Sequence, residues 1–208
     1  MAVVVFGASW AQPGDALYEE SMRLGRGLAS HGLTLINGGY NGTMEGSARG
    51  AAEVAGSERI GVIVSALFPS RAEQGNPWLT RTSDEPDRLA RIRSMALRAS
   101  CFVVMRGTLG TLTEVAAVWN IAALTAAAGG AQLKILCYRD PWETTLKAAG
   151  ASLGISEAHM GALTFVEDAA EAVAEAAKWH AAARGSGGED GAAGGSGGGG
   201  AAAAPVRE

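Results

Sequence analysis

The sequence has few of the residues that mark disulfide-rich, metal-binding or nucleic-acid-binding proteins. Its two cysteines, Cys101 and Cys137, lie in apolar runs, so we predict buried, reduced thiols rather than a disulfide. A net charge of −4 provides no basic surface, which argues against nucleic acid as a partner. The histidines, His31, His159 and His180, lack the spacing to acids or thiols of a metal site or a catalytic triad. We therefore expect no metal and no other cofactor.

Long apolar runs are missing as well. No segment reaches the roughly 18 uninterrupted apolar residues of a membrane span, and the N-terminal sequence MAVVVFGASW lacks the basic region of a signal peptide. These absences predict a cytoplasmic protein with no membrane partner. What is present, 48% hydrophobic and 18% charged residues in 208, is ordinary for a globular protein with a full core.

The C-terminal end differs in composition from the rest of the chain. From Arg184 it reads RGSGGEDGAAGGSGGGGAAAAPVRE, which is rich in Gly, Ala and Ser and has little to bury. We predict a single domain over residues 1–182 and a disordered tail over residues 183–208.

Within the domain, short apolar runs alternate with helical patterns. The predicted strands are Val3–Phe6, Leu33–Ile36, Ile60–Val64, Cys101–Val104, Lys134–Tyr138 and Leu163–Val166. The predicted helices are Asp15–Ser30, Met44–Ala55, Asp84–Ala99, Leu112–Ala126, Trp142–Leu153 and Ala169–Trp179. A long loop, Ser65–Thr82, is a candidate lid. Strands that are apolar throughout and alternate with helices predict an α/β fold: a Rossmann-like, doubly wound, mostly parallel sheet with helices on both faces.

Loops of small residues follow three of the predicted strands. They are Gly7-Ala8-Ser9, Gly38–Glu45 and Arg106–Glu114. Ligands of doubly wound sheets bind outside the carboxyl ends of the strands, where the strand order reverses. The three loops therefore predict one ligand site at this edge of the sheet.

The second of these loops, within GGYNGTMEGSARGA, opens a predicted helix. Free amides at a helix N-terminus attract anions, although the same sequence also suits a simple strand-to-helix turn without a ligand. The loop is not the GxGxxG fingerprint and does not follow the first strand, which argues against a nicotinamide dinucleotide.

The third loop, within MRGTLGTLTEVAAVWN, has two interpretations. Gly107, Gly110 and Thr111 follow a strand and open a helix, which is where backbone amides would hold a phosphate. Alternatively, Thr111 and Glu114 form a capping box, in which the carboxylate of Glu114 only accepts the amide of Thr111. Spacing alone does not separate a phosphate cradle from a helix cap.

Arginines are concentrated on the helix before this loop. Arg88 and Arg91 lie three residues apart and share a helix face. A guanidinium there suits a phosphate or a carboxylate, whereas the alternative is a solvated basic face.

The chain resembles the LONELY GUY (LOG) family, formerly described as possible lysine decarboxylases. The resemblance covers about residues 2–180 and is carried by the N-terminal strand and glycine loop, the GGYNGTME turn and the family hallmark PGGxGTxxE. The hallmark aligns with residues 106–114, which read RGTLGTLTE, and the arginine that precedes it in the family aligns with Arg91.

The resemblance implies a phosphoribohydrolase that cleaves the N-glycosidic bond of a nucleoside 5'-monophosphate, such as a cytokinin ribotide or AMP. It also implies a homodimer that needs no metal or nicotinamide. Glu114 and Arg91 would be catalytic. The expected substrate-binding residues are Gly107, Thr108, Gly110, Thr111, Gly38, Gly39, Glu45, Ser9 and Arg88.

Two positions depart from the hallmark. Arg106 replaces its proline and Thr108 its second glycine. A threonine would be strained if this position needs a positive φ, and the arginine would either add charge near the phosphate or obstruct the pocket. Such changes suit a non-catalytic nucleotide- or cofactor-binding protein, like the molybdenum cofactor carriers of the same superfamily. A structural domain with a vestigial site is the third alternative.

Overall fold

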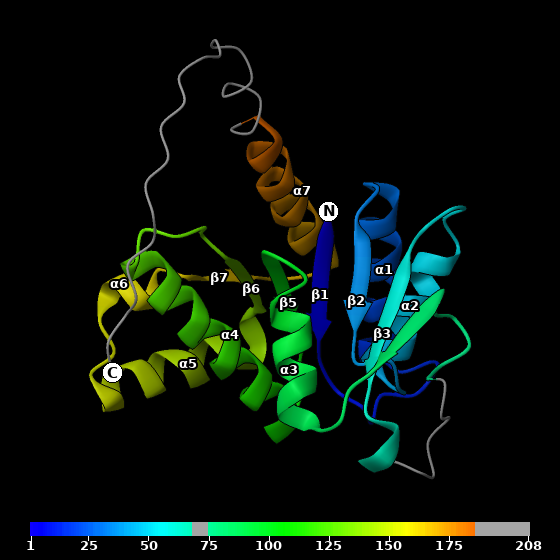
Figure 1. Ribbon diagram of the computed structural model, residues 1–208, viewed down its shortest axis with the longest axis horizontal. Helices are drawn as coiled ribbons and strands as arrows, with labels where there is room; N and C mark the ends of the chain where they lie inside the picture. The colour runs from blue at the N-terminus through cyan, green and yellow to red at the C-terminus, as the bar shows by residue number, and fades with distance from the viewer. Residues whose placement is uncertain (68–74, 186–208) are drawn as a thin grey trace, which may run out of the picture.

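The structure, a computed structural model, describes residues 1–67 and 75–185. Seven parallel strands form one sheet, with helices on both of its faces (Figure 1). The strands are β1 (Ala2–Phe6), β2 (Thr34–Asn37), β3 (Arg59–Ile63), β4 (Arg81–Asp84), β5 (Cys101–Val104), β6 (Lys134–Tyr138) and β7 (Leu163–Val166). The helices are α1 (Ala16–Ser30), α2 (Thr43–Ala52), the 3-10 helix η1 (Ser65–Leu67), α3 (Arg88–Ala96), α4 (Leu109–Ala127), α5 (Arg139–Leu153), α6 (Glu157–Met160) and α7 (Ala169–Gly185). The predicted Rossmann-like α/β class is confirmed.

The strand order is β4-β3-β2-β1-β5-β6-β7. Strand β1 lies at the centre, where Val4 pairs with Ile36 of β2 on one side and with Phe102 of β5 on the other. The chain builds the sheet outward from β1 to β4, then returns and builds outward again from β5 to β7. The direction reverses between β1 and β5, so the crevice for a ligand lies beyond the carboxyl ends of these two strands.

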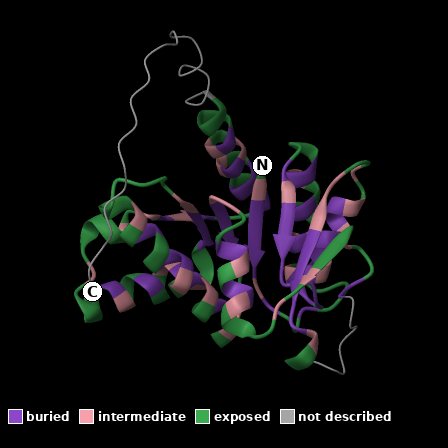
Figure 2. Ribbon diagram, in the orientation of Figure 1, coloured by how far each residue is buried: buried purple, intermediate pink, exposed green. Residues whose placement is uncertain are grey.

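The helices form two layers around the sheet. Helices α1, α2 and α7 pack together, with α1 contacting both others, whereas α3 and α4 contact each other on the opposite face (Figure 1). Between the layers, the central strands β1, β2 and β5 are buried except at the first residues of β1 and β2 (Figure 2). The sequence reads as continuous apolar runs here because both faces of these strands are covered.

Both cysteines lie in this core. Cys101 on β5 and Cys137 on β6 are buried and free, as the apolar runs around them predict. Burial in apolar surroundings raises the pKa of each thiol to about 12, so neither is a reactive thiolate at neutral pH.

The sequence prediction is wrong around β4. The helix expected over Asp84–Ala99 begins only at Arg88, because the carboxylate of Asp87 caps it by accepting the amides of Leu89 (2.7 Å) and Ala90 (2.8 Å). The four residues of β4, RTSD, form an edge strand with little burial, so they lack the apolar signal of the other strands. The short helix α6 was not predicted either.

Two other expectations lie partly outside the described residues. The candidate lid, Ser65–Thr82, includes residues 68–74, which the structure does not describe. The tail predicted over residues 183–208 is described only to Gly185, where α7 ends.

Helix α4 is long and apolar enough to cross a membrane by length and composition. In this fold it instead covers the sheet, with Val115, Val118, Trp119 and Ala122 buried against the core. It is therefore a layer helix of the α/β sandwich, although much of its outer surface is apolar and exposed.

Candidate functional site

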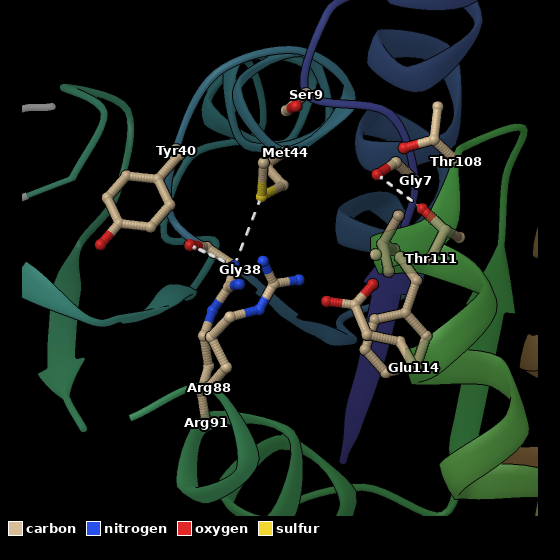
Figure 3. A pocket seen from close by; sticks show the side chains of 13 residues that line it. Gly7, Ser9, Gly38, Tyr40, Met44, Arg88, Arg91, Thr108, Thr111 and Glu114 are labelled. Carbon is tan, nitrogen blue, oxygen red and sulfur yellow. Dashed lines mark hydrogen bonds between the residues drawn. The ribbon is translucent and has the colours of Figure 1, made fainter. Parts of the chain in front are cut away.

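A cavity of ≈ 180 Å³ lies at the reversal of strand order, beyond β1 and β5. All three predicted loops contribute to it, together with the arginine helix α3 (Figure 3). Its lining consists of Val5, Phe6, Gly7, Ser9, Gly38, Tyr40, Met44, Arg88, Arg91, Thr108, Gly110, Thr111 and Glu114. The predicted location of the site thus coincides with a real cavity.

The N-terminus of α4 forms one wall of the cavity. The helix begins at Leu109, and the hydroxyl of Thr111 donates to the carbonyl of Gly7 at 3.0 Å, tying α4 to β1. A Cβ at Gly107 would lie 2.0 Å from that hydroxyl oxygen, so only glycine fits. The N-cap residue Thr108 makes no side-chain cap hydrogen bond, and the first-turn amides have no partner within the helix. They remain available to an anion.

Glu114 lies one turn into α4 and extends across the cavity toward Arg88 and Arg91 on α3 (Figure 3). Among residues 1–67 and 75–185, no hydrogen bond or ion pair engages its carboxylate, so the capping-box interpretation does not hold. Burial raises the pKa of Glu114 to about 7, against the opposing effect of the two guanidinium groups. A carboxyl group with this pKa can donate or accept a proton near neutral pH.

Arg91 forms part of the opposite wall of the cavity. Its side chain is 7% exposed, and it donates through Nε to the carbonyl of Val62 (2.7 Å) and through Nη2 to the carbonyl of Gly38 (2.8 Å). The guanidinium also lies 5.5 Å from the centre of the Tyr40 ring, a cation–π distance. These contacts join the ends of β2 and β3 and fix one positive charge in the wall.

Arg88 differs from Arg91 although both line the cavity. Arg88 is exposed, and its guanidinium makes no hydrogen bond or ion pair with any residue that the structure describes. Its Nη2 is 3.3 Å from the position that a Cβ of Gly110 would take, so it lies beside the first turn of α4. A guanidinium that makes no hydrogen bond or ion pair with a described residue therefore lies next to helix amides that have no partner within the helix.

The turn after β2 shapes the cavity from the other side. Gly39 has φ +76°, and a Cβ there would lie 2.6 Å from Cγ2 of Ile63, so this position requires glycine. The side-chain amide of Asn76 donates to the carbonyls of Gly39 (3.2 Å) and Tyr40 (3.1 Å). Gly39 and Gly107 thus support the cavity without lining it.

Sequence reasoning missed Tyr40, Met44 and Asn76. Tyr40 and Met44 lie inside the GGYNGTME loop, in which only Gly38, Gly39 and Glu45 were predicted to bind substrate. Asn76 lies in the predicted loop Ser65–Thr82, and the structure shows it buried there.

Ser9 lines the cavity as predicted, but Glu45 does not. Helix α2 begins at Thr43, so Met44 faces the cavity and Glu45, about 100° further around the helix, faces α1. There its carboxylate accepts the hydroxyl of Tyr18 at 3.1 Å. The structure therefore corrects the assignment of Glu45 as a substrate-binding residue.

The two departures from the family hallmark do not disturb the cavity. Arg106 pairs with Asp140 at 3.2 Å on the exposed surface and is not part of the lining. Thr108 has φ −121°, which any residue adopts without strain. Arg106 therefore does not obstruct the cavity.

Residues 1–129 match the model of the SLOG cluster4 family, and this range contains every residue of the cavity. The chain belongs to this family. Its resemblance to LOG proteins is thereby confirmed at the level of the Rossmann-like superfamily that includes both. No curated protein matches the sequence significantly.

Solved structures with the same fold include a protein called TM1055, with 23% identity, a TM-score of 0.64, and coverage of 85% of this chain and 98% of that one. The molybdenum cofactor binding protein of Rippkaea orientalis has 21% identity, a TM-score of 0.64, and coverage of 86% and 96%. A molybdenum cofactor carrier protein of Chlamydomonas reinhardtii has 24% identity, a TM-score of 0.61, and coverage of 86% and 97%. At this identity the similarity establishes the fold.

The residues that the structure describes contain no group of three His, Cys, Asp or Glu side chains placed to hold a metal ion. The chemistry available in the cavity is instead that of two guanidiniums, one carboxyl group and the amides of a helix N-terminus.

Proposed function

We propose that the cavity binds a small molecule that carries a phosphate, either a nucleotide or a phosphorylated cofactor. The position of Arg88 beside the first turn of α4 is the observation that carries the proposal. Helix amides and a guanidinium together bind phosphate well, because the amides supply directed donors and the arginine supplies charge. Arg91 adds a second positive charge from the wall.

Binding without turnover is the form of the proposal that the comparisons favour. Two of the proteins with this fold are described as binding or carrying the molybdenum cofactor.

Calorimetric titration with inorganic phosphate and with AMP tests the proposal. Binding of both ligands is expected, together with recovery of AMP unchanged and a loss of affinity of tenfold or more in Arg88→Gln. A matched control is Arg93→Gln on the same helix, because Arg93 is not part of the lining. Failure of wild-type protein to bind either ligand would favour the vestigial domain and overturn the proposal.

Phosphoribohydrolase activity is a second candidate, favoured by Glu114. Cleavage of an N-glycosidic bond develops positive charge on the ribose, which a carboxylate stabilises. Water adds to the anomeric carbon, the base departs with the bonding electrons, and one proton passes from the water to the base. Glu114 has a pKa of about 7, and no described residue hydrogen-bonds to its carboxylate, so it suits the transfer of that proton.

Incubation of the protein with AMP and with isopentenyladenosine monophosphate tests this activity. Chromatography should detect free base and ribose 5-phosphate from wild type and none from Glu114→Gln, while Glu114→Gln still binds AMP. Full activity in Glu114→Gln, or no release by wild type, would contradict it.

We further propose that the expected homodimer forms through the outer face of α4. Glu114 is the only charged residue of α4 and faces the cavity, which leaves a neutral apolar surface on the outside. Such a surface suits a second copy of itself better than a charged partner. The large exposed apolar residues of α4 are Leu109, Leu112, Ile121 and Leu124, and α3 and its C-cap add the exposed Leu89 and Leu97.

Light scattering after size-exclusion chromatography tests the dimer. Wild type should have the mass of two chains, Leu124→Glu the mass of one, and the control Leu153→Glu on α5 the wild-type mass. A monomeric wild type, or a dimeric Leu124→Glu, would exclude this interface. The cytoplasmic location stays a prediction from the sequence.

A further inference from the structure

An exposed tryptophan lies in the loop that follows β1, one position after a residue that lines the cavity. Trp10 is 51% exposed and directly follows Ser9, which lines the cavity. Nothing in the proposed phosphate site uses this indole. A large aromatic side chain at such a position offers a flat apolar surface to whatever emerges from the cavity.

The backbone of this loop is held in place by α2. The amide of Thr43 donates to the carbonyl of Ala8 at 2.8 Å, and a Cβ at Gly42 would lie 2.7 Å from the Cα of Ser9. Gln12 reinforces the turn by donating through its side chain to the carbonyl of Trp10 at 3.2 Å. The tryptophan therefore sits on a fixed loop, so less conformational entropy is lost when a ligand contacts it.

The size of the cavity limits what it can enclose. At ≈ 180 Å³ it is smaller than the roughly 300–1,000 Å³ of pockets that bury a whole small-molecule ligand. With a phosphate at Arg88 and α4, less than this ≈ 180 Å³ is left for the rest of the ligand. Any ring system attached to it must extend past the rim, which Ser9 and Thr108 help to form.

We propose that Trp10 stacks on a flat heteroaromatic ring of the phosphorylated ligand. This inference rests on the proposed function and narrows it: the ligand is a phosphate ester that carries a purine-like or pterin-like ring. Stacking tolerates different rings because each presents a π face, so Trp10 selects for the presence of a ring rather than for its hydrogen-bonding edge.

The test compares AMP with ribose 5-phosphate, which lacks the ring, by calorimetric titration of wild type, Trp10→Ala and Trp10→Phe. Trp10→Ala should lower the affinity for AMP about tenfold or more and leave that for ribose 5-phosphate within about twofold, since stacking is lost and phosphate binding is kept. Trp10→Phe should restore most of the AMP affinity. Trp78→Ala is the matched control, because Trp78 is 36% exposed but lies against Arg49, 5.4 Å from its ring centre.

The outcomes separate this inference from the proposed function. Equal AMP affinity in wild type and Trp10→Ala overturns the stacking role while phosphate binding stands. An equal loss for AMP and ribose 5-phosphate in Trp10→Ala also overturns it, because the loop would then act on the phosphate site. Absence of binding of both ligands to wild type overturns the inference together with the proposed function.

Discussion

The guanidinium of Arg91 occupies the space that a side chain at residue 38 would need. Its Nη2 donates to the carbonyl of Gly38 at 2.8 Å and lies 1.5 Å from the position of a Cβ on that residue. Glycine at 38 and arginine at 91 therefore form one structural unit. The unit connects the β2 turn to α3 and places a buried positive charge opposite Glu114.

Replacement of Gly38 by alanine should destabilise the fold, because the added methyl group displaces a buried guanidinium from its backbone acceptors. We expect a loss of about 1–3 kcal/mol in the free energy of unfolding, measured by urea denaturation. The control is Gly161→Ala, where a Cβ would meet its nearest atom at 3.4 Å and should change stability much less. A Gly38→Ala variant as stable as wild type would contradict the fit described for Arg91.

Replacement of Arg91 and of Arg88, the two arginines that line the cavity, should affect the stability of the protein differently. Arg91→Met removes the donor of two backbone carbonyls and should lower stability by about 2–4 kcal/mol. Arg88→Met should change stability by less than about 0.5 kcal/mol, because the side chain is exposed and makes no hydrogen bond or ion pair with a described residue. Urea denaturation of both variants, with phosphate titration of Arg88→Met, measures the difference. Similar destabilisation by both changes would show that the distinction is wrong.

Glu114→Gln should stabilise the protein in a pH-dependent manner. The folded state raises the pKa of Glu114 to about 7, so this group favours folding at pH 4 and that contribution is lost as the pH rises to about 7. Above that pH the buried carboxylate opposes folding by at most about 3 kcal/mol, and glutamine removes the charge. Thermal unfolding should therefore show a gain at pH 8 that shrinks toward pH 4. The exposed change Glu157→Gln serves as the control, and an equal gain at both pH values would refute a raised pKa.

Arg106→Ala should leave phosphate affinity within about twofold of wild type. Its partner Asp140 and the arginine itself are both on the exposed surface, where an ion pair contributes about 0–1 kcal/mol to stability. Calorimetric titration beside Arg88→Gln provides the comparison. A loss of affinity as large as that of Arg88→Gln would assign Arg106 to the phosphate site after all.

The sequence predicted most of the sheet because most of its strands are apolar throughout. Strands β5, β6 and β7 have the predicted bounds, since each is a short, mostly apolar run. The position of the cavity was also predictable, because small-residue loops after parallel strands must gather at one edge of the sheet.

The individual roles in the site were not predictable to the same degree. Arg88 and Arg91 share a helix face, so periodicity treats them alike, and only the space left by Gly38 decides which one is buried. The orientation of Glu45 depends on the residue at which α2 begins, and a shift of one residue turns a side chain by about 100°. The choice between a helix cap and a phosphate cradle likewise depended on where α4 begins. The helix begins at Leu109, two residues before Thr111, which the sequence predicted as its cap.

The polar sequence of β4 has a consequence for the edge of the sheet that this strand forms. An edge strand presents unpaired backbone groups that can recruit a strand from another molecule. Two charged side chains of β4 lie along that edge. Arg81 pairs with Glu58, and Asp84 accepts a hydrogen bond from the amide of Ser65. The absence of an apolar pattern, which hid this strand from prediction, thus also disfavours the pairing of this edge with a strand of another molecule.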